Sequence, residues 1–163
     1  HSYSSAASDV YKRQQLFMEL GLITVDSISK TFMDHNDSGK FECVFTSVEI
    51  EKNNSIMFKN FEDTNLGIWS AHGEGKFILP GEETDYNIIG KYSKNSFPSN
   101  PNGSDFNTAI LANKDGRHIA MMPHLERSLF PWNWGFYPKN KSCHTISPWI
   151  QAFKNAHDWL KYK

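Results

Sequence analysis

Short apolar runs separated by turn residues recur along this chain, and runs of this length predict the strands of a sheet. They fall at residues 41–50, 66–71, 86–92, 109–112 and 118–122. The last two runs flank Asn113–Gly116, whose turn-forming residues predict that the two strands pair with each other. Pro123 ends the final strand, because proline has no N–H to donate to a ladder.

The run at residues 41–50 carries apolar side chains on both faces. They are Phe41, Cys43, Phe45, Val44, Val48 and Ile50. This pattern predicts a central strand that is covered on both sides. Cys43 is therefore expected to be a buried core residue and not a nucleophile, because apolar surroundings raise the pKa of a thiol.

Two helices are predicted, one near each end of the apolar pattern. Residues 15–22 have apolar residues at helical spacing and Gly21 as a terminator. Their apolar stripe is Leu16, Phe17 and Leu20. The last helix has Ser147 as its N-cap and Pro148 in its first position. Its apolar face is Trp149, Ile150, Phe153, Ala156 and Leu160. Helices and strands together predict an α/β domain.

Residues 1–14 lack such a pattern. Serine and alanine dominate them, and they contain no hydrophobic core of a signal peptide. We expect this segment to be a foreign or disordered leader. Residues 15–163 then form one domain, because a chain of 163 residues is long enough for a single core.

Composition limits the partners of the domain. The formal net charge of −1 argues against nucleic acid and anionic membrane surfaces, and no apolar run approaches the length of a membrane span. Cys43 and Cys143 lack metal-type spacing and suit a reducing, cytoplasmic compartment. The 12 Phe and 5 Trp residues predict an aromatic core or an exposed face for another domain, and residues 130–138 concentrate them.

Two ionisable residues, His124 and Glu126, follow directly after the strand that Pro123 ends. Catalytic groups of open α/β sheets lie at the carboxyl ends of strands, where a cleft opens. A carboxylate beside a histidine fixes its tautomer and makes it a competent general base. The pair predicts a catalytic site, although the same spacing also occurs without a catalytic role. No His-Glu-x-x-His or paired cysteine spacing supports a metal site.

Two polar stretches offer further candidates. His72 and Glu74 follow the strand at residues 66–71, with a glycine after each of them, and Asn102 lies in an Asn-Pro-Asn-Gly segment. Each stretch is either part of a binding site or a structural turn. If His72 and Glu74 face the same cleft as His124, the strand at residues 66–71 must neighbour the strand at residues 118–122.

Several motifs occur in the order found in one family. The segment from Asp115 to Arg127, DGRHIAMMPHLER, resembles the histidine–glutamate motif of class I glutamine amidotransferases. More narrowly, it resembles the glutaminase domains of phosphoribosylformylglycinamidine synthases. The segments MDHNDSGKFE, AHGEGK and NPNGS are similar to motifs of the same family. The resemblance covers residues 15–163 and implies a flavodoxin-like amidotransferase sheet that is incomplete at its N-terminal side.

The resemblance implies a glutaminase. His124 would be the general base and acid of a Cys-His-Glu triad, and Glu126 would orient it. His72, Glu74 and Asn102 would contact glutamine. The released ammonia would convert formylglycinamide ribonucleotide to the amidine in purine biosynthesis, in a synthetase domain that uses ATP and Mg²⁺. Glutamine and that synthetase domain are the implied partners, and no cofactor is implied for this domain itself.

The sequence departs from the family pattern at two places. Leu125 replaces the usual proline between the histidine and the glutamate, which is expected to loosen the backbone there. Aligning Gln15 with the end of the family's Cys-Asn-Gly-Cys-Gln run places Tyr11 at the position of the nucleophile, and a phenol is a poor substitute for a thiol. We therefore expect an inactive piece of an active enzyme. The alternative is a non-catalytic interaction module with an exposed aromatic surface.

Overall fold

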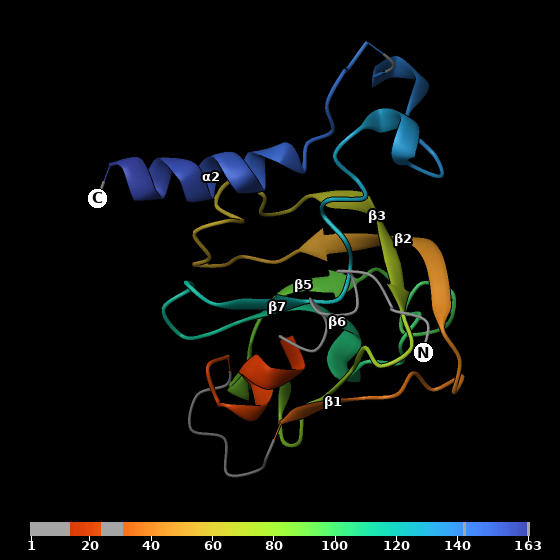
Figure 1. Cartoon of the computed structure of the whole chain (residues 1–163), viewed down its shortest axis with the longest axis vertical. Coiled ribbons are helices and arrows are strands. Elements are labelled where there is room, and N and C mark those ends of the chain that lie inside the picture. The colour runs from red at the N-terminus through yellow and green to blue at the C-terminus, as the bar shows by residue number, and fades with distance from the viewer. Residues whose placement is uncertain (1–13, 24–30, 142, 163) are drawn as a thin grey trace, which may run out of the picture.

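The computed structural model describes residues 14–23, 31–141 and 143–162. Its strands are β1 (Phe32–Asp34), β2 (Glu42–Ile50), β3 (Asn65–His72), β4 (Lys76–Ile78), β5 (Asn87–Tyr92), β6 (Thr108–Ala112) and β7 (Ile119–Met121). Residues 14–19 are helical, and helix α2 spans Ile150–Lys161. Short 3-10 turns lie at Glu83–Asp85, Asp105–Asn107, Pro131–Asn133 and Lys139–Lys141. Helices and sheet occur together, as the predicted α/β class requires (Figure 1).

Five strands form the larger sheet in the order β3-β2-β5-β6-β7, and each of its ladders is antiparallel. These strands confirm the five predicted runs. The pairing of β6 with β7 confirms the predicted hairpin, whose turn is closed by a hydrogen bond from Gly116 N–H to Asn113 O. β1 and β4 form a separate two-stranded sheet. The sequence pattern does not predict these two strands, because three residues are too few to show a period.

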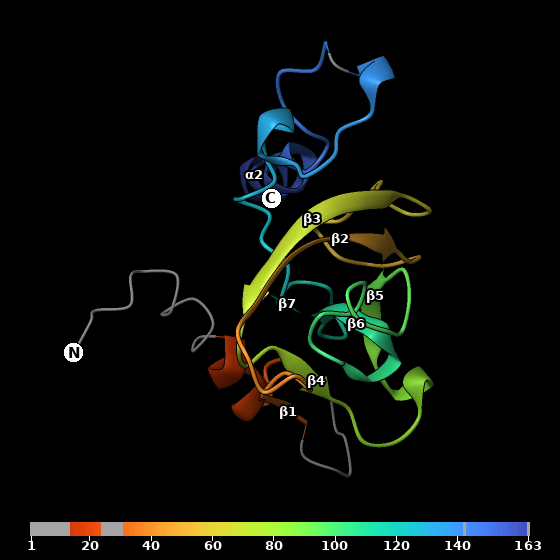
Figure 2. The ribbon, with the colours of Figure 1, turned by 90° about the vertical axis from the view of Figure 1, so that its right-hand side faces the viewer.

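The larger sheet curls until its two edge strands approach each other. Figure 2 shows the bent β2 and β3 arching over β5, β6 and β7. Trp69 of β3 forms an isolated antiparallel bridge with His124, just beyond β7. The strand at residues 66–71 was predicted to neighbour the strand at residues 118–122. As a statement about strand pairing this prediction is wrong, because β3 and β7 are the opposite edges of the sheet. The curl nevertheless brings their ends together.

Apolar side chains pack on both faces of β5, β6 and β7. One cluster includes Val48, Ile68, Ile89, Ile110, Met121 and Trp149. The other includes Met18, Phe77, Ile88, Leu111, Ala120 and Met122. Every residue of β6 is buried, which explains why its sequence is an unbroken apolar run. The carboxyl end of β7 therefore leaves the sheet from a rigid double-sided core.

β2 is buried on one face only. Its residues 46, 48 and 50 are buried, whereas Cys43 is exposed. On the same face as Cys43, Phe45 is partly covered by Trp69 and Trp134, with ring centroids 5.3 and 5.8 Å away. The predicted core position of Cys43 is therefore wrong. Apolar residues on both faces of this strand reflect a partial cover by the segment after β7, not a full second layer.

The first helical segment ends as predicted but buries different residues. Gly21 has a φ of 68°. Its N–H donates to Met18 O, and Leu22 N–H donates to Phe17 O, which together form a Schellman motif. Met18 is 2% exposed, whereas Leu16 and Leu20, both in the predicted stripe, are 50% and 61% exposed. The predicted stripe is wrong for Leu16 and Leu20, whereas Phe17 is partly buried against the cluster that contains Met18.

Helix α2 buries only part of the predicted apolar face, because Trp149 is buried and Ile150 and Ala156 are partly buried. It begins at Ile150, and the predicted N-cap Ser147 accepts a hydrogen bond of 3.3 Å from Trp149 N–H one residue before the helix. Trp149 and Ala152 are buried, while Phe153 and Leu160 are exposed. Figure 1 shows α2 beside β2 and β3. The helix contacts the sheet over a narrow stripe that starts at Trp149.

The aromatic residues of 130–138 were predicted to form either part of a core or an exposed face, and the structure shows some of them packed and others exposed. Trp134 packs on Phe45, whereas Trp132 and Phe136 are 71% and 70% exposed.

The predicted leader, including Tyr11, lies outside the described residues, with the exception of Gln14. None of the helices in the described part of the chain is long and apolar enough to cross a membrane.

Candidate active site

The end of β7 is held from two sides before the chain reaches His124. Met122 N–H donates to Ala109 O of β6 over 3.2 Å. Met122 O accepts a hydrogen bond of 2.6 Å from Nε2 of His72, the last residue of β3. Beyond Pro123, the N–H of His124 donates to Trp69 O over 2.7 Å. The backbone of His124 is therefore positioned by both edges of the curled sheet.

His124 and Glu126 form a close side-chain pair, as predicted. Nδ1 of His124 lies 2.5 Å from Oε1 of Glu126. Partial burial raises the pKa of Glu126, but the hydrogen bond and charge of His124 outweigh that effect, so the pKa lies below its ordinary value. An ionised Glu126 accepts the Nδ1–H of His124, which leaves Nε2 as the nitrogen for proton transfer.

Leu125, just before the glutamate, and Ser128, two residues after it, anchor this short segment. Leu125 is 6% exposed and belongs to the main apolar cluster. Ser128 Oγ donates to His124 O over 3.2 Å and accepts a hydrogen bond of 3.2 Å from Trp69 N–H. Burial of the Leu125 side chain opposes the loosening that is expected from the missing proline.

His72 lies against His124 inside the curl. The two rings stack with centroids 5.8 Å apart and an interplanar angle of 20°. Since Met122 O can only accept, Nε2 of His72 carries the proton, and Nδ1 accepts a hydrogen bond of 2.9 Å from Asn102 Nδ2. Burial lowers the pKa of His72 to about 4. The ring is therefore neutral at physiological pH.

We expect this neutral ring to make the domain acid-sensitive. Between the ordinary pKa of 6.5 and the folded pKa of about 4, the unfolded chain binds a proton that the folded chain excludes. The free energy of unfolding should therefore fall as the pH is lowered through this window, by about 3 kcal/mol from His72. Urea unfolding across pH 7 to 4 should show a smaller loss for His72→Gln. Equal pH sensitivity of both proteins would contradict the assignment.

Asn102 is fully buried, and protein groups satisfy its side chain. Its Oδ1 accepts a hydrogen bond of 3.0 Å from Tyr92 OH. Its Nδ2 donates to Asn36 Oδ1 over 2.7 Å as well as to His72. The predicted direct contacts of His72 and Asn102 with glutamine stay predictions, and in this structure the two buried side chains are engaged with each other.

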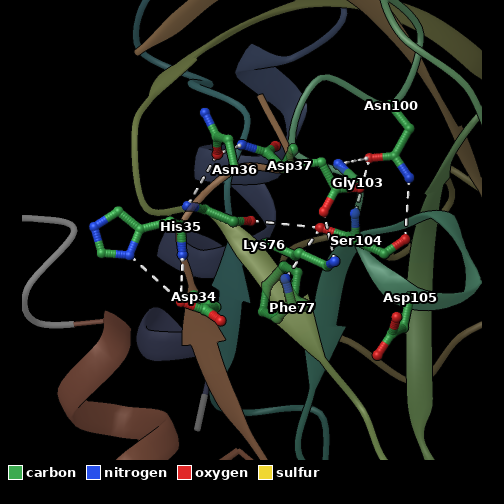
Figure 3. A network of polar contacts seen from close by, with 12 residues as sticks. Asp34, His35, Asn36, Asp37, Lys76, Phe77, Asn100, Gly103, Ser104 and Asp105 are labelled. Carbon is green, nitrogen blue, oxygen red and sulfur yellow. Dashed lines mark hydrogen bonds and ion pairs between the residues drawn. The ribbon is translucent and has the colours of Figure 1, made fainter. Parts of the chain in front are cut away.

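The same loops are tied together at the surface next to this buried network. Figure 3 shows Asp37 and Lys76 pointing toward the loop of Gly103 and Ser104. Lys76 Nζ lies 2.6 Å from Asp37 Oδ1. Asn100 Oδ1 accepts hydrogen bonds of 3.0 and 3.1 Å from the N–H groups of Gly103 and Ser104. A side chain at Gly103 would place its Cβ 1.9 Å from Asp37 Oδ2, so glycine permits this close approach.

Comparison with known proteins identifies the fold and the family of this arrangement. Residues 14–160 match the family model of the CobB/CobQ-like glutamine amidotransferase domain. This chain belongs to that family. A solved structure titled "Structure of PurLQS from Thermotoga maritima" aligns with a TM-score of 0.68 and 24% identity, over 94% of this chain and 66% of that chain. The amidotransferase fold is therefore shown, including the curled antiparallel sheet.

Named relatives of the amidotransferase domain are much longer proteins. The chain is 40% identical over 146 residues to "Probable phosphoribosylformylglycinamidine synthase, chloroplastic/mitochondrial" of Arabidopsis thaliana, covering 78% of the chain and 10% of the relative. It is 36% identical over 166 residues to the phosphoribosylformylglycinamidine synthase of Dictyostelium discoideum, covering 87% of this chain and 12% of that relative. For the synthase of Homo sapiens the identity is 36% over 137 residues, covering 77% of this chain and 10% of that relative. The chain spans about a tenth of the length of these relatives.

Glu74 of the amidotransferase domain has other partners than the His124 pair. Its side chain is 56% exposed, and Oε1 lies 3.5 Å from His35 Nε2. Gln15 Nε2 donates to Glu74 Oε2 over 3.3 Å. The structure thus brings His72 beside His124 and places Glu74 against the first helical segment, so the predicted role of Glu74 in binding glutamine stays a prediction.

Sequence reasoning missed the residues that hold the pair. Asn36 has no predicted role in the site, yet its Nδ2 donates to His72 O over 2.6 Å and to Lys40 O over 2.9 Å. Tyr92 and Trp69 were expected only as strand residues. The one available signal is the position of Asn36 inside the motif MDHNDSGKFE. Contacts that join residues 36, 72 and 102 have no short-range pattern.

The described cysteines do not complete a triad in this amidotransferase domain. Cys43 is paired with Ala71 across the β2–β3 ladder, so its side chain lies on the opposite face from Ser70 and His72. Cys143 is exposed in the segment before α2. No group of three or more His, Cys, Asp or Glu side chains that would hold a metal ion occurs among residues 14–23, 31–141 and 143–162.

Proposed function

We propose that this domain supplies the histidine–glutamate part of a glutaminase site in a phosphoribosylformylglycinamidine synthase. The observation that carries the proposal is the pair of His124 and Glu126, held 2.5 Å apart at the end of β7. The names of the long relatives support the choice of enzyme. Membership of a glutamine amidotransferase family supports glutamine as the substrate.

The chemistry assigns one task to each residue of the pair. A thiolate, from a cysteine that is not among these 163 residues, attacks the amide carbon of glutamine and forms a thioester. The amide nitrogen takes a proton from His124 and leaves as ammonia. Water then gives a proton to His124 and attacks the thioester, which releases glutamate and the thiolate. Glu126 keeps the His124 tautomer fixed and stabilises the imidazolium at both stages.

The ammonia released at the glutaminase site is consumed in a second reaction at another site. We infer that a separate synthetase domain, with ATP and Mg²⁺, converts formylglycinamide ribonucleotide to the amidine with this ammonia. That domain would be the main protein partner. A reducing, cytoplasmic compartment is supported by the two exposed free thiols of Cys43 and Cys143.

A second candidate function is an interaction module without catalysis. It is favoured by the exposure of Trp132 and Phe136. Phe136 also lines a surface hollow of about 540 Å³, whose other lining residues are Phe45, Thr46, Ser47, Asn65, Gly67, Ser93, Lys94, Pro98, Ser99, Trp134 and Pro138. Apolar patches of this kind mark protein contacts. The exposed surface by itself fits either candidate, because a glutaminase domain must also dock against the domain that receives its ammonia.

The test is a hybrid synthase in which residues 14–160 replace the matching segment of the Dictyostelium discoideum relative. The relative then supplies all other parts, including the position before residue 14 to which the alignment assigns the nucleophile. Product formation is measured with glutamine and, separately, with ammonia as the nitrogen donor. We expect both reactions to proceed. A hybrid that uses ammonia but not glutamine would contradict the glutaminase proposal.

We also expect no glutamate release from glutamine by the 163-residue chain alone. Cys43 lies on the opposite face of β2 and β3 from His72, and Cys143 is exposed before α2. A triad that lacks its nucleophile loses roughly 10⁶-fold in turnover. Glutamate is assayed for the chain and for its Cys43→Ser, Cys143→Ser double variant. Turnover by the chain that the double variant abolishes would show that one of these thiols serves as the nucleophile.

A further inference from the structure

We propose that His72 is a positioning residue for His124, which acts through Met122 and does not touch glutamine. The inference rests on the proposed role of His124 as the proton carrier. It assigns to the buried residues His72, Asn102, Asn36 and Tyr92 one shared task, which is to hold the end of β7 and the His124 ring in a single arrangement.

The first support is mechanical. Nε2 of His72 donates to Met122 O over 2.6 Å, two residues before His124, across a sequence separation of 50 residues. The His72 ring also stacks on the His124 ring. Rotation of the His124 ring away from Glu126 is thus opposed by a ring that is itself fixed at two atoms. A general base held in this way keeps its proton-transfer nitrogen in one position and orientation, and rate acceleration by proximity requires such a fixed geometry.

The second support is the direction of the hydrogen bonds. Tyr92 OH donates to Asn102 Oδ1, which turns Asn102 Nδ2 toward both Asn36 Oδ1 and His72 Nδ1. Asn36 cannot reverse its own amide without losing the bonds from Nδ2 to His72 O and Lys40 O. Nδ1 of His72 is therefore an acceptor, and Nε2 is the donor that Met122 needs. The buried network is satisfied in one orientation only.

The third support concerns charge. A proton on His72 Nδ1 would face the N–H of Asn102, so the network keeps the ring neutral. Charged or titratable groups near the two rings are Glu126, Arg127 and Tyr92, and burial keeps the Tyr92 hydroxyl protonated by raising its pKa. A neutral ring beside His124 allows His124 to become an imidazolium without repulsion from a second cation.

The matched pair His72→Gln and His72→Asn tests the mechanical role in the full chain. Glutamine extends one methylene further, so its amide N–H reaches Met122 O, whereas that of asparagine falls short. The readout is the NMR signal of the Nδ1–H proton that His124 shares with Glu126. We expect His72→Asn to abolish or broaden this signal and His72→Gln to retain it. His118→Asn, a change of an exposed histidine at the other end of β7, serves as the control and should also retain it.

A folded His72→Asn protein with an unchanged His124 signal would overturn the proposal. If His72→Asn does not fold, nitrogen NMR of the unchanged chain decides instead. We expect His72 to be neutral and protonated at Nε2 at pH 5. A ring that is protonated at Nδ1 there, or already cationic, would overturn the proposal as well.

The hybrid synthase separates this inference from the proposed function. With glutamine as donor, His72→Asn should lower kcat roughly 10²-fold and leave KM within about 2-fold, because His72 contacts Met122 and not the substrate. A raised KM with unchanged kcat would identify His72 as a glutamine contact and would contradict its role as a positioning residue. If His124→Asn itself leaves the glutamine reaction intact, the proposed function fails, whatever His72 does.

Discussion

Replacing His124 with asparagine in the hybrid synthase is expected to lower glutamine-dependent turnover by at least about 10³-fold. Asparagine retains an N–H that can bond to Glu126, so the local structure is largely preserved. Its amide cannot accept and return a proton at neutral pH, and both proton transfers of the glutaminase reaction are lost. The measurement is steady-state product formation with saturating glutamine.

The ammonia-dependent reaction of the same variant provides the internal control. It bypasses the glutaminase site, so it should match that of the unchanged hybrid. His118→Asn is the matched substitution, because His118 is exposed and its Nδ1 lies 3.0 Å from Asn113 Nδ2, at the start of the same strand. Retained glutamine-dependent activity in His124→Asn would rule out His124 as the proton carrier.

Replacing Trp149 with alanine is expected to reduce the free energy of unfolding by about 3–5 kcal/mol. Trp149 is 0% exposed. Its ring stacks on Phe61 at 5.8 Å and meets Phe58 edge-on at 6.4 Å. Its Nε1–H donates to Gly67 O of β3 over 2.8 Å. The substitution both opens a cavity and leaves a strand carbonyl without its donor. Urea unfolding followed by circular dichroism measures the change.

Two companion variants separate the contributions to this loss. Trp149→Phe keeps most of the ring packing and removes the indole N–H, so it should cost about 1–3 kcal/mol. Trp132→Ala removes an indole that is 71% exposed and should change stability by no more than about 0.5 kcal/mol. Equal losses for Trp149→Ala and Trp132→Ala would show that α2 does not anchor β3 in the way described.

The parts of the fold that the sequence predicts are those encoded by local patterns. The β6–β7 hairpin follows from two apolar runs around Asn113–Gly116, and the position of His124 follows from Pro123. The close pairing of His124 with Glu126 is likewise local, since only Leu125 separates them. Strand length, turn chemistry and proline are properties of neighbouring residues, so one sequence is sufficient to read them.

The wrong predictions concern which face of a strand or helix is buried against the rest of the domain. The apolar residues of β2 suggest two covered faces, but Cys43 faces outward because the segment after β7 reaches only as far as Phe45. In α2, Phe153 and Leu160 belong to the apolar stripe of the sequence, yet they are exposed. Periodicity shows that a helix has an apolar side but not how far that side is rotated toward the sheet.

The role of His72 was beyond the reach of sequence patterns for a different reason. Its partners, Asn102 and Met122, lie 30 and 50 residues away. A histidine followed by glycine, glutamate and glycine suggests a polar turn open to substrate, and the fold instead places the ring under the end of β7. Only the curl of the sheet, which no local motif encodes, brings these residues together.

The closure of the curled sheet also bears on how the domain behaves in concentrated solution. Edge strands expose unpaired backbone groups on which another chain can add a strand. Here Trp69 O is occupied by the His124 N–H, and Met121 N–H by Gln14 Oε1 at 3.0 Å. One contact that fixes the histidine thus also occupies a backbone group of the β3 edge, and Gln14 occupies one of the β7 edge. Any change that frees the segment from His124 to Ser128 would expose a template for aggregation as well as weaken the site.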